Sequence, residues 1–306
     1  MPLQGSDVTR PEIGLAPFRI VRPAEQTAPL VFASPHSGRD YPAHFLHQAR
    51  LDPTTLRRSE DCFVDELFAG ATQAGAPMIA ANFPRAFCDP NREPWELDPA
   101  MFADDLPAWV NTTSARVGAG LGTLARVVAS GEAIYRHKLP FEEAELRVHA
   151  YWQPYHDALQ DLLESTRSRF GVCVLVDCHS MPAQGTTPRS EPLEFVLGDA
   201  HGTSCAPRVT RAAESALIEM GYRVRRNDPY AGGYVTRHYG RPRDHVHTLQ
   251  VEIARSLYMD EARLHRADGF VTLQRRMTSF AASMARAATE LAAIQEKVAV
   301  PKHRQV

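Results

Sequence analysis

The sequence predicts an α/β protein whose mostly parallel or mixed central sheet is flanked by helices on both faces. Short apolar runs rich in β-branched residues alternate along the chain with longer segments whose apolar residues recur at helical spacing. Several of the short runs are apolar throughout, which is typical of strands buried on both faces. The 306 residues are also enough to bury a substantial core.

These patterns divide the chain into expected strands and helices. The expected strands cover residues 30–33, 78–83, 172–177, 195–197 and 248–253. The expected helices cover residues 61–73, 118–130, 141–169, 206–220 and about 260–297. Residues 1–25 are expected to form an irregular lead-in and residues 26–300 a single domain, because no linker or internal repeat interrupts them.

Composition and charge limit the classes of partner. The formal net charge of −2 provides no basic field for a nucleic-acid backbone, so we expect no such partner. No apolar stretch approaches the roughly 20 residues that cross a bilayer, and the first residues lack the pattern of a secretion signal. We therefore expect a cytoplasmic protein with no membrane partner. The five cysteines include no C-x-x-C pair, which favours reduced thiols over disulfides or a thiolate zinc cluster.

The glycines at 118, 120 and 122 suggest a dinucleotide-binding loop at first sight. No buried strand precedes them, however, and their spacing differs from G-x-G-x-x-G. A flexible loop that opens a helix is the expected structure.

Two of the apolar runs lead to a histidine. Residues 29–33 run into the turn that holds His36, and residues 171–176 run into His179. A single histidine after a strand is more often a turn residue or a hydrogen-bonded core residue. Two of them at the carboxyl edge of one sheet, where open α/β sheets bind ligands, indicate a metal site, because imidazole is the commonest protein ligand for zinc.

A third ligand is expected near residue 60, because a catalytic zinc typically has three protein ligands and one open position. Glu60, Asp61 and Asp65 are the candidates. Asp61 lies at the start of the expected helix and could reach a metal, while Asp65 could support the site one turn later. The same residues are equally good helix caps, so the pattern alone leaves the choice open.

Glu252 is a candidate general base. In residues 248–255 apolar side chains alternate with Gln250 and Glu252, so both polar side chains project to one face near the end of the expected strand. A half-buried carboxylate has a raised pKa and suits proton transfer from water. An equally acceptable structure is an edge-strand glutamate paired with Arg255.

The loop 82–92 is a candidate for anion binding. It gathers Arg85, Asn91 and Arg92 among proline and aromatic residues, which indicate a rigid loop. The planar guanidinium group binds carboxylates through two hydrogen bonds and stabilises oxyanions. Most arginines at a protein surface are simply solvated.

Several longer segments together resemble the N-formylglutamate amidohydrolase family. They occur in the family's order over about residues 28–262 and read SPHSGRDYP, EDCFVDELF, NFPRAFCDPNREPWELDP, YWQPYH, VDCHSMP, GDAHGTSC, NDPYAGGYVTRHYGRP and LQVEIARSLYMDE. The family is similar in fold to zinc carboxypeptidases and to the aspartoacylase and succinylglutamate desuccinylase group, which bind zinc through His, an acidic residue and His. The carboxypeptidases carry Glu three residues after the first His, where this chain has Arg39.

The resemblance implies a metal site and a base. It implies one zinc ion per chain, bound by His36, Asp61 and His179, and it matches Asp61 rather than Glu60 to the family's metal-binding aspartate. Glu252 matches the general base.

The resemblance also implies a substrate site. Arg85 resembles the arginine that stabilises the oxyanion, and the pair Asn91 and Arg92 resembles a clamp for a substrate carboxylate. A further substrate loop is matched by residues 232–237, in which Gly233, Tyr234 and Arg237 are the candidate contacts.

Together these features predict zinc-dependent hydrolysis of N-formyl-L-glutamate, a small anionic molecule, to formate and L-glutamate, as in the last step of one histidine-degradation route. The first alternative is zinc-dependent deacylation of another N-acyl amino acid or acidic amide. A nucleophile hydrolase using Ser37, Ser180 or Cys178 is disfavoured, because the chain has no G-x-S-x-G elbow. A catalytically inactive binding protein is the remaining alternative. A homo-oligomer is compatible with the sequence.

Overall fold

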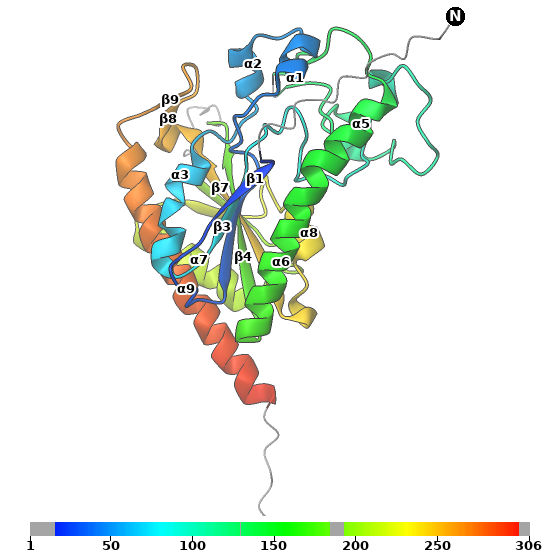
Figure 1. Cartoon of the computed structure of the whole chain (residues 1–306). Coiled ribbons are helices and arrows are strands. Elements are labelled where there is room, and N and C mark those ends of the chain that lie inside the picture. The colour runs from blue at the N-terminus through cyan, green and yellow to red at the C-terminus, as the bar shows by residue number, and fades with distance from the viewer. Residues whose placement is uncertain (1–15, 129, 184–192, 300–306) are drawn as a thin grey trace, which may run out of the picture.

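A central sheet with helices on both faces organises the protein (Figure 1). The computed structural model describes residues 16–128, 130–183 and 193–299. The seven strands lie in the order β1-β3-β2-β4-β7-β5-β6. Their bounds are β1 Phe18–Val21, β2 Leu30–Ser34, β3 Met78–Ala81, β4 Cys173–Met181, β5 Phe195–Gly198, β6 Val224–Arg226 and β7 Val246–Ala254.

The sheet is mixed, as expected. Strands β3, β2, β4 and β7 are parallel neighbours, β1 is antiparallel to β3, and β5 is antiparallel to β7. β4 and β7 pair over nine positions, so that His179 lies directly opposite Glu252 and Asp177 lies opposite Gln250. Because side chains alternate between the faces of a strand, these four polar residues share one face near the carboxyl ends of the two strands.

Apolar cores lie on both faces of the sheet. On one face, α3 (Val64–Leu67), α7 (Pro207–Glu219) and α9 (Phe270–Ala299) pack against alternate strand residues such as Val176 and Cys178. On the other face, α6 (Gln153–Phe170) packs against the residues between them, such as Leu175. α8 (Tyr234–Tyr239) lies on this second face beside β7. The faces of the central strands therefore alternate between two packed layers, which confirms the predicted fold class.

The remaining elements are short. They are α1 (Ala43–Gln48), α2 (Pro53–Arg57), α4 (Ala115–Gly118) and α5 (Phe141–Arg147), a hairpin of β8 (Met259–Asp260) and β9 (His265–Arg266), and several 3-10 turns. A π-helical turn at Val148–Trp152 joins α5 to α6 just before Pro154, whose ring lacks an N–H and disrupts regular helical bonding. The expected helix 141–169 is thus confirmed with an irregular turn inside it.

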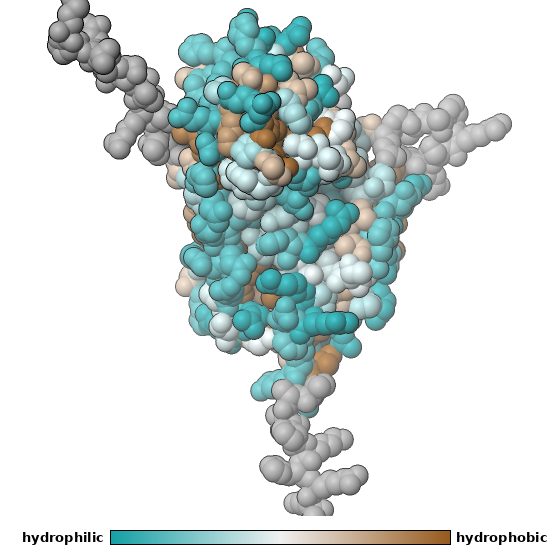
Figure 2. Space-filling model, turned by 90° about the vertical axis from the view of Figure 1, so that its right-hand side faces the viewer, coloured by the Kyte–Doolittle hydropathy of each residue, from teal (hydrophilic) through white to brown (hydrophobic). Residues whose placement is uncertain are grey.

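None of the helices in the described ranges is long and apolar enough to cross a membrane. Figure 2 shows a mainly hydrophilic face, with apolar side chains gathered in its upper part, where Figure 1 places α5.

Several expected elements differ from the structure. Phe18–Val21 forms the edge strand β1, so the expectation of an irregular lead-in is wrong for these residues; residues 1–15 lie outside the described ranges. The expected helix 61–73 is broken into α3 and a 3-10 helix at Ala69–Ala74, because Phe63 adopts a left-handed conformation with φ 65° directly before α3. The expected helix 118–130 is replaced by turns and isolated bridges after α4, as its glycines favour.

Candidate metal centre and active site

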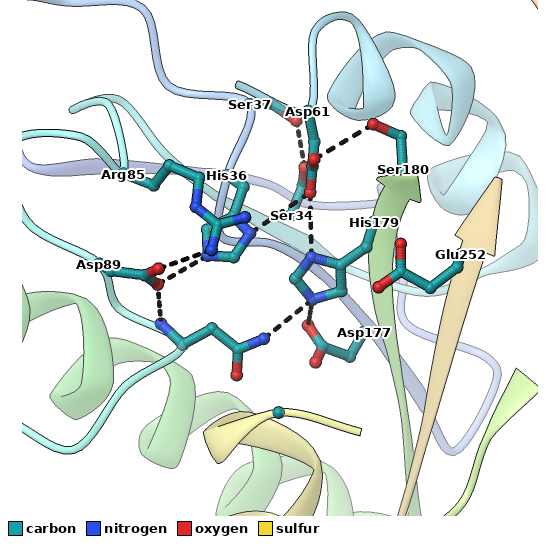
Figure 3. A network of polar contacts seen from close by, with 12 residues as sticks. Ser34, His36, Ser37, Asp61, Arg85, Asp89, Asp177, His179, Ser180 and Glu252 are labelled. Carbon is teal, nitrogen blue, oxygen red and sulfur yellow. Dashed lines mark hydrogen bonds and ion pairs between the residues drawn. The ribbon is translucent and has the colours of Figure 1, made fainter. Parts of the chain in front are cut away.

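Three buried side chains from distant parts of the chain meet at the carboxyl edge of β2 and β4 (Figure 3). His36 lies in the turn after β2, Asp61 lies in the turn before α3, and His179 lies within β4. The Nδ1 atoms of His36 and His179 are 3.3 and 3.0 Å from Asp61 Oδ2. A tetrahedral zinc with bonds of about 2.0–2.1 Å holds its ligand atoms roughly 3.3–3.4 Å apart. These two distances are close to that value, and all three ligand atoms lie within 4.8 Å of one another, so the set could hold a zinc ion.

Both imidazoles are oriented by a second carboxylate. His36 Nε2 lies 2.7 Å from Asp89 Oδ1, and His179 Nε2 lies 3.0 Å from Asp177 Oδ1. A carboxylate hydrogen-bonded to Nε2, as Asp89 is at His36, holds the proton there and leaves the Nδ1 lone pair for a metal. In the described part of the chain, the buried Nδ1 of His36 has no hydrogen-bond partner, as expected for a metal-binding nitrogen.

Asp61 is suited to bind a metal through one oxygen. Its Oδ1 accepts hydrogen bonds from Ser180 Oγ at 3.1 Å and from Arg255 Nη2 at 3.2 Å, while Oδ2 faces the two imidazoles. Burial by itself raises the pKa of Asp61, but the neighbouring imidazoles of His179 and His36 hold that pKa well below its usual value. Asp61 is therefore a carboxylate at neutral pH, as a ligand must be.

Glu60 and Asp65, the other two carboxylates proposed near residue 60, are held away from this centre. Glu60 accepts hydrogen bonds from Tyr41 Oη at 2.7 Å and from Arg57 Nε at 3.1 Å. Asp65 forms ion pairs with Arg19 and Arg39. Arg39 also lies 3.4 Å from Glu66. The geometry thus favours Asp61 among the three candidates.

Glu252 lies beside the metal-binding atoms on the same face of the sheet. Only 7% of the residue is exposed, and burial raises its pKa to about 7 against the opposing charge of His179. Gln250 Nε2 donates a hydrogen bond of 2.9 Å to Glu252 Oε1. The alternative of an edge-strand glutamate paired with Arg255 is wrong, because Arg255 pairs with Asp61 instead, and β7 is a central strand. A buried carboxylate with this pKa suits a general base.

The loop 82–92 is held rigidly over the centre, as predicted. Trp152 Nε1 donates to the carbonyl of Arg92 at 3.0 Å, and His156 Nε2 lies 2.8 Å from the carbonyl of Pro90. Asp89 Oδ2 accepts a hydrogen bond of 2.8 Å from Arg85 Nη2, so the same carboxylate that orients His36 also positions Arg85. Trp152 and His156 lie in the segment YWQPYH, so these hydrogen bonds join that segment to the loop.

Arg92 and Asn91 have different environments. Arg92 Nε and Nη1 donate to the carbonyls of Leu121 and Asn91 at 2.8 and 2.7 Å, which directs the remaining nitrogen, Nη2, toward Asp89 at 3.9 Å. Asn91 Oδ1 accepts from the amide of Val235 at 2.8 Å, and its Nδ2 lies 3.3 Å from His179 Nε2. Asn91 therefore contacts both the substrate loop and a candidate metal ligand.

The substrate loop predicted at 232–237 lies against Asn91 and β7. A Cβ atom on Gly233 would lie 2.3 Å from Asn91 Nδ2, so only glycine permits this approach. The Gly233 amide donates to Gln250 Oε1 at 2.8 Å. Tyr234 and Arg237 follow in α8 and line an outer pocket of about 270 Å³.

The site opens into a cavity of about 450 Å³. Its lining includes the candidate ligands, Glu252, and guanidinium groups from several elements: Arg85, Arg92, Arg116, Arg237 and Arg255. Such a cavity suits a small anionic molecule.

The three side chains considered as nucleophiles are engaged elsewhere. Ser37 bonds with the hydroxyl of Ser34 and accepts from the Asp65 amide, and Ser180 is bonded to Asp61 and Arg255. Cys178 faces the opposite core, and burial raises the pKa of its thiol well above the usual value. Within the described ranges, none of the three hydroxyl or thiol groups hydrogen-bonds to an imidazole.

The fold and this centre agree with comparisons to known proteins. The model of the N-formylglutamate amidohydrolase family matches residues 28–259, which include every candidate site residue from His36 to Glu252. The chain belongs to the N-formylglutamate amidohydrolase family. The chain is 30% identical over 249 residues to the N-formylglutamate deformylase of Pseudomonas putida, covering 76% of the chain and 82% of that protein.

Two further relatives support the assignment. The N-formylglutamate deformylase of Pseudomonas aeruginosa is 30% identical over 243 residues, covering 76% of the chain and 83% of the relative. The crystal structure of N-formylglutamate amidohydrolase from Ralstonia eutropha JMP134 superimposes with a TM-score of 0.84 at 38% identity, covering 90% of the chain and 99% of that structure.

Asp89, Asp177 and Gln250 are the functional candidates that the sequence analysis missed. Asp177 and Gln250 each lie two residues before a predicted site residue on the same strand, so strand alternation alone was enough to place them on the same face. Asp89 had no such signal, because its role depends on a contact with His36 across 53 residues of sequence.

Proposed function

We propose that this amidohydrolase hydrolyses N-formyl-L-glutamate to formate and L-glutamate, with one zinc ion held by His36, Asp61 and His179. The observation that carries the proposal is the position of Glu252 directly opposite His179, beside the three donors and within an arginine-lined cavity. The names of the two Pseudomonas relatives support the choice of substrate. We further propose that residues 26–300 act as one catalytic domain in the cytoplasm, at the last step of a histidine-degradation route.

The chain's own residues account for the proton transfers. When bound, zinc polarises the carbonyl group that it faces and lowers the pKa of water. Glu252 accepts a proton from the attacking water molecule as the new C–O bond forms at the formyl carbon. Glu252 then returns this proton to the nitrogen as the C–N bond breaks, which releases formate and the amino group of glutamate.

Arginines at the cavity wall stabilise charge. Arg85, fixed by Asp89, is positioned to donate to the developing oxyanion, an effect worth roughly 3–4 kcal/mol for a well-placed donor. Asn91 and Arg92 hold a substrate carboxylate, and Gly233 and Tyr234 border the bound molecule.

Substitution of the base tests this proposal. Glu252→Gln keeps the side-chain shape and removes the basic oxygen, so the variant should retain zinc and lose roughly two to four orders of magnitude in turnover. The exposed Glu219 provides a matched control, and Glu219→Gln should match the parent enzyme. Formate release and zinc content are measured on the same preparations. A loss of zinc equal to the loss of rate would make Glu252 a ligand instead of the base.

A broader acyl-amide substrate range is the second candidate, because the cavity accepts carboxylates without a visible requirement for the formyl group. Rates with N-formylglutamate, N-acetylglutamate and N-formyl-leucine separate the two. Equal rates with N-formylglutamate and N-formyl-leucine would contradict selectivity for an acidic side chain.

A further inference from the structure

Two arginines at the outer end of the cavity have no side-chain partner among the residues that the structure describes. Arg116 in α4 and Arg237 in α8 line both the main cavity and the outer pocket. Within the part of the chain that the structure describes, neither guanidinium group makes a hydrogen bond or an ion pair. Arg85 and Arg255, deeper in the cavity, are both bonded to carboxylates. The outer arginines are therefore available to an anion from solution.

The short turn around α4 holds Arg116 in this place. Ser114 Oγ accepts from the Val117 amide at 3.1 Å, and the Val117 side chain is buried. A Cβ atom on Gly122 would lie 2.1 Å from the Glu96 carbonyl, so the turn packs closely on the segment that contains Glu96. The glycine-rich segment that resembles a dinucleotide loop thus serves to position an arginine over the cavity.

Cations are in excess near the junction of the two pockets. Burial lowers the pKa of Arg92, and the nearby charges of Arg85 and Arg116 lower it further against the opposing effect of Asp89. The two carboxylates of the outer pocket already have donors: Glu93 accepts from Asn111 Nδ2 at 3.1 Å, and Glu96 accepts from the Glu93 amide at 3.3 Å. The outer pocket is thus lined by three guanidinium groups and two carboxylates, and this excess of positive charge favours an anionic ligand.

We propose that Arg116 and Arg237 together bind the side-chain carboxylate of the substrate and thereby select an acidic acyl amino acid. This inference rests on the proposed function, which places the reacting amide beside His179 and the first carboxylate at Asn91 and Arg92. A substrate with a second carboxylate farther along its side chain extends from that point toward the outer pocket. Two guanidinium groups from different elements of the fold, α4 and α8, then bind this carboxylate.

The test compares substrates that differ only in this charge. N-formylglutamine has the shape of N-formylglutamate without the side-chain charge. In Arg116→Gln, kcat/KM for N-formylglutamate should fall about 10–100-fold, the range for a charge-assisted contact, while kcat/KM for N-formylglutamine stays within about threefold. Arg237→Gln should change the ratio in the same direction. Arg211→Gln, at an exposed position on α7, is the control and should leave both values unchanged.

Two outcomes would overturn the inference. If Arg116→Gln lowered kcat/KM equally for both substrates, Arg116 would have a structural role. If it changed neither value, Arg116 would take no part in substrate recognition. Titration of the zinc-loaded enzyme with L-glutamate and L-glutamine gives a readout independent of turnover. If no formyl substrate is hydrolysed, the proposed function is wrong. The inference is still supported in that case if the parent enzyme binds glutamate more tightly than glutamine and Arg116→Gln loses this difference. Equal binding of glutamate and glutamine by the parent enzyme would refute it.

Discussion

Asp89 offers the sharpest test of how the metal centre is supported. Its carboxylate receives His36 Nε2 at 2.7 Å, Arg85 Nη2 at 2.8 Å and the Asn91 amide at 2.8 Å. Burial raises its pKa, but Arg85 and His36 outweigh this effect and hold the pKa well below its usual value. The group is therefore charged, and it connects a candidate metal ligand with the arginine assigned to the oxyanion.

Asp89→Asn keeps the shape of this side chain and removes its charge. Substitution of a carboxylate behind a metal-binding histidine typically weakens metal binding 10–100-fold, which corresponds to about 1.4–2.7 kcal/mol. We expect a loss of zinc affinity in this range. We also expect a loss of turnover at saturating zinc, because Arg85 loses the anion that positions it.

Competition with a chromophoric chelator measures the zinc affinity, and formate release at saturating zinc measures the turnover. Asp161→Asn, at an exposed position on α6, is the control for the substitution itself. The reasoning would be refuted if Asp89→Asn and Asp161→Asn bound zinc equally well. If Asp89→Asn had a normal zinc affinity and only its turnover fell, Asp89 would act only by positioning Arg85.

Two further predictions concern the neighbours of the site. Gln250→Ala removes the hydrogen bond that stabilises the charged form of Glu252, so the pKa of Glu252 should rise from about 7 in the metal-free protein. In the zinc-loaded enzyme, kcat should therefore begin to decline at a higher pH than in the parent when the pH is lowered. An unchanged pH profile of kcat would contradict this. Glu60→Gln weakens the buried contacts with Tyr41 and Arg57, so it should lower the Tm of thermal unfolding while the zinc affinity stays within about twofold. A large loss of bound zinc would make Glu60 a ligand.

Apolar patterning located the central strands, because buried parallel strands are continuous apolar runs. The edge strands β1 and β6 escaped detection, since each has only four or three residues, and arginine occupies part of both. β4 continues four residues beyond the expected end at 177, because β7 pairs with its polar end as well. His179 consequently lies inside a strand rather than in the loop after it.

The candidate metal ligands were easier to find from the sequence than the residues that hold them in place. The choice between Glu60 and Asp61 could not come from spacing, because both lie in the same turn. Their tertiary partners separate them: Arg57 and Tyr41 hold Glu60, whereas the imidazoles and Arg255 face Asp61. A rule based on periodicity contains no such information.

The hydrogen bonds of the site connect substrate binding with proton transfer. The Gly233 amide donates to Gln250, which in turn donates to Glu252, and Asn91 bridges the Val235 amide and His179. A shift of the loop that borders the outer pocket would therefore be passed on both to Glu252 and to a candidate metal ligand. Contacts made by the distal end of the substrate can then stabilise the transition state as well as the bound ground state. For this reason substrates that lack the second carboxylate should lose turnover and not only affinity.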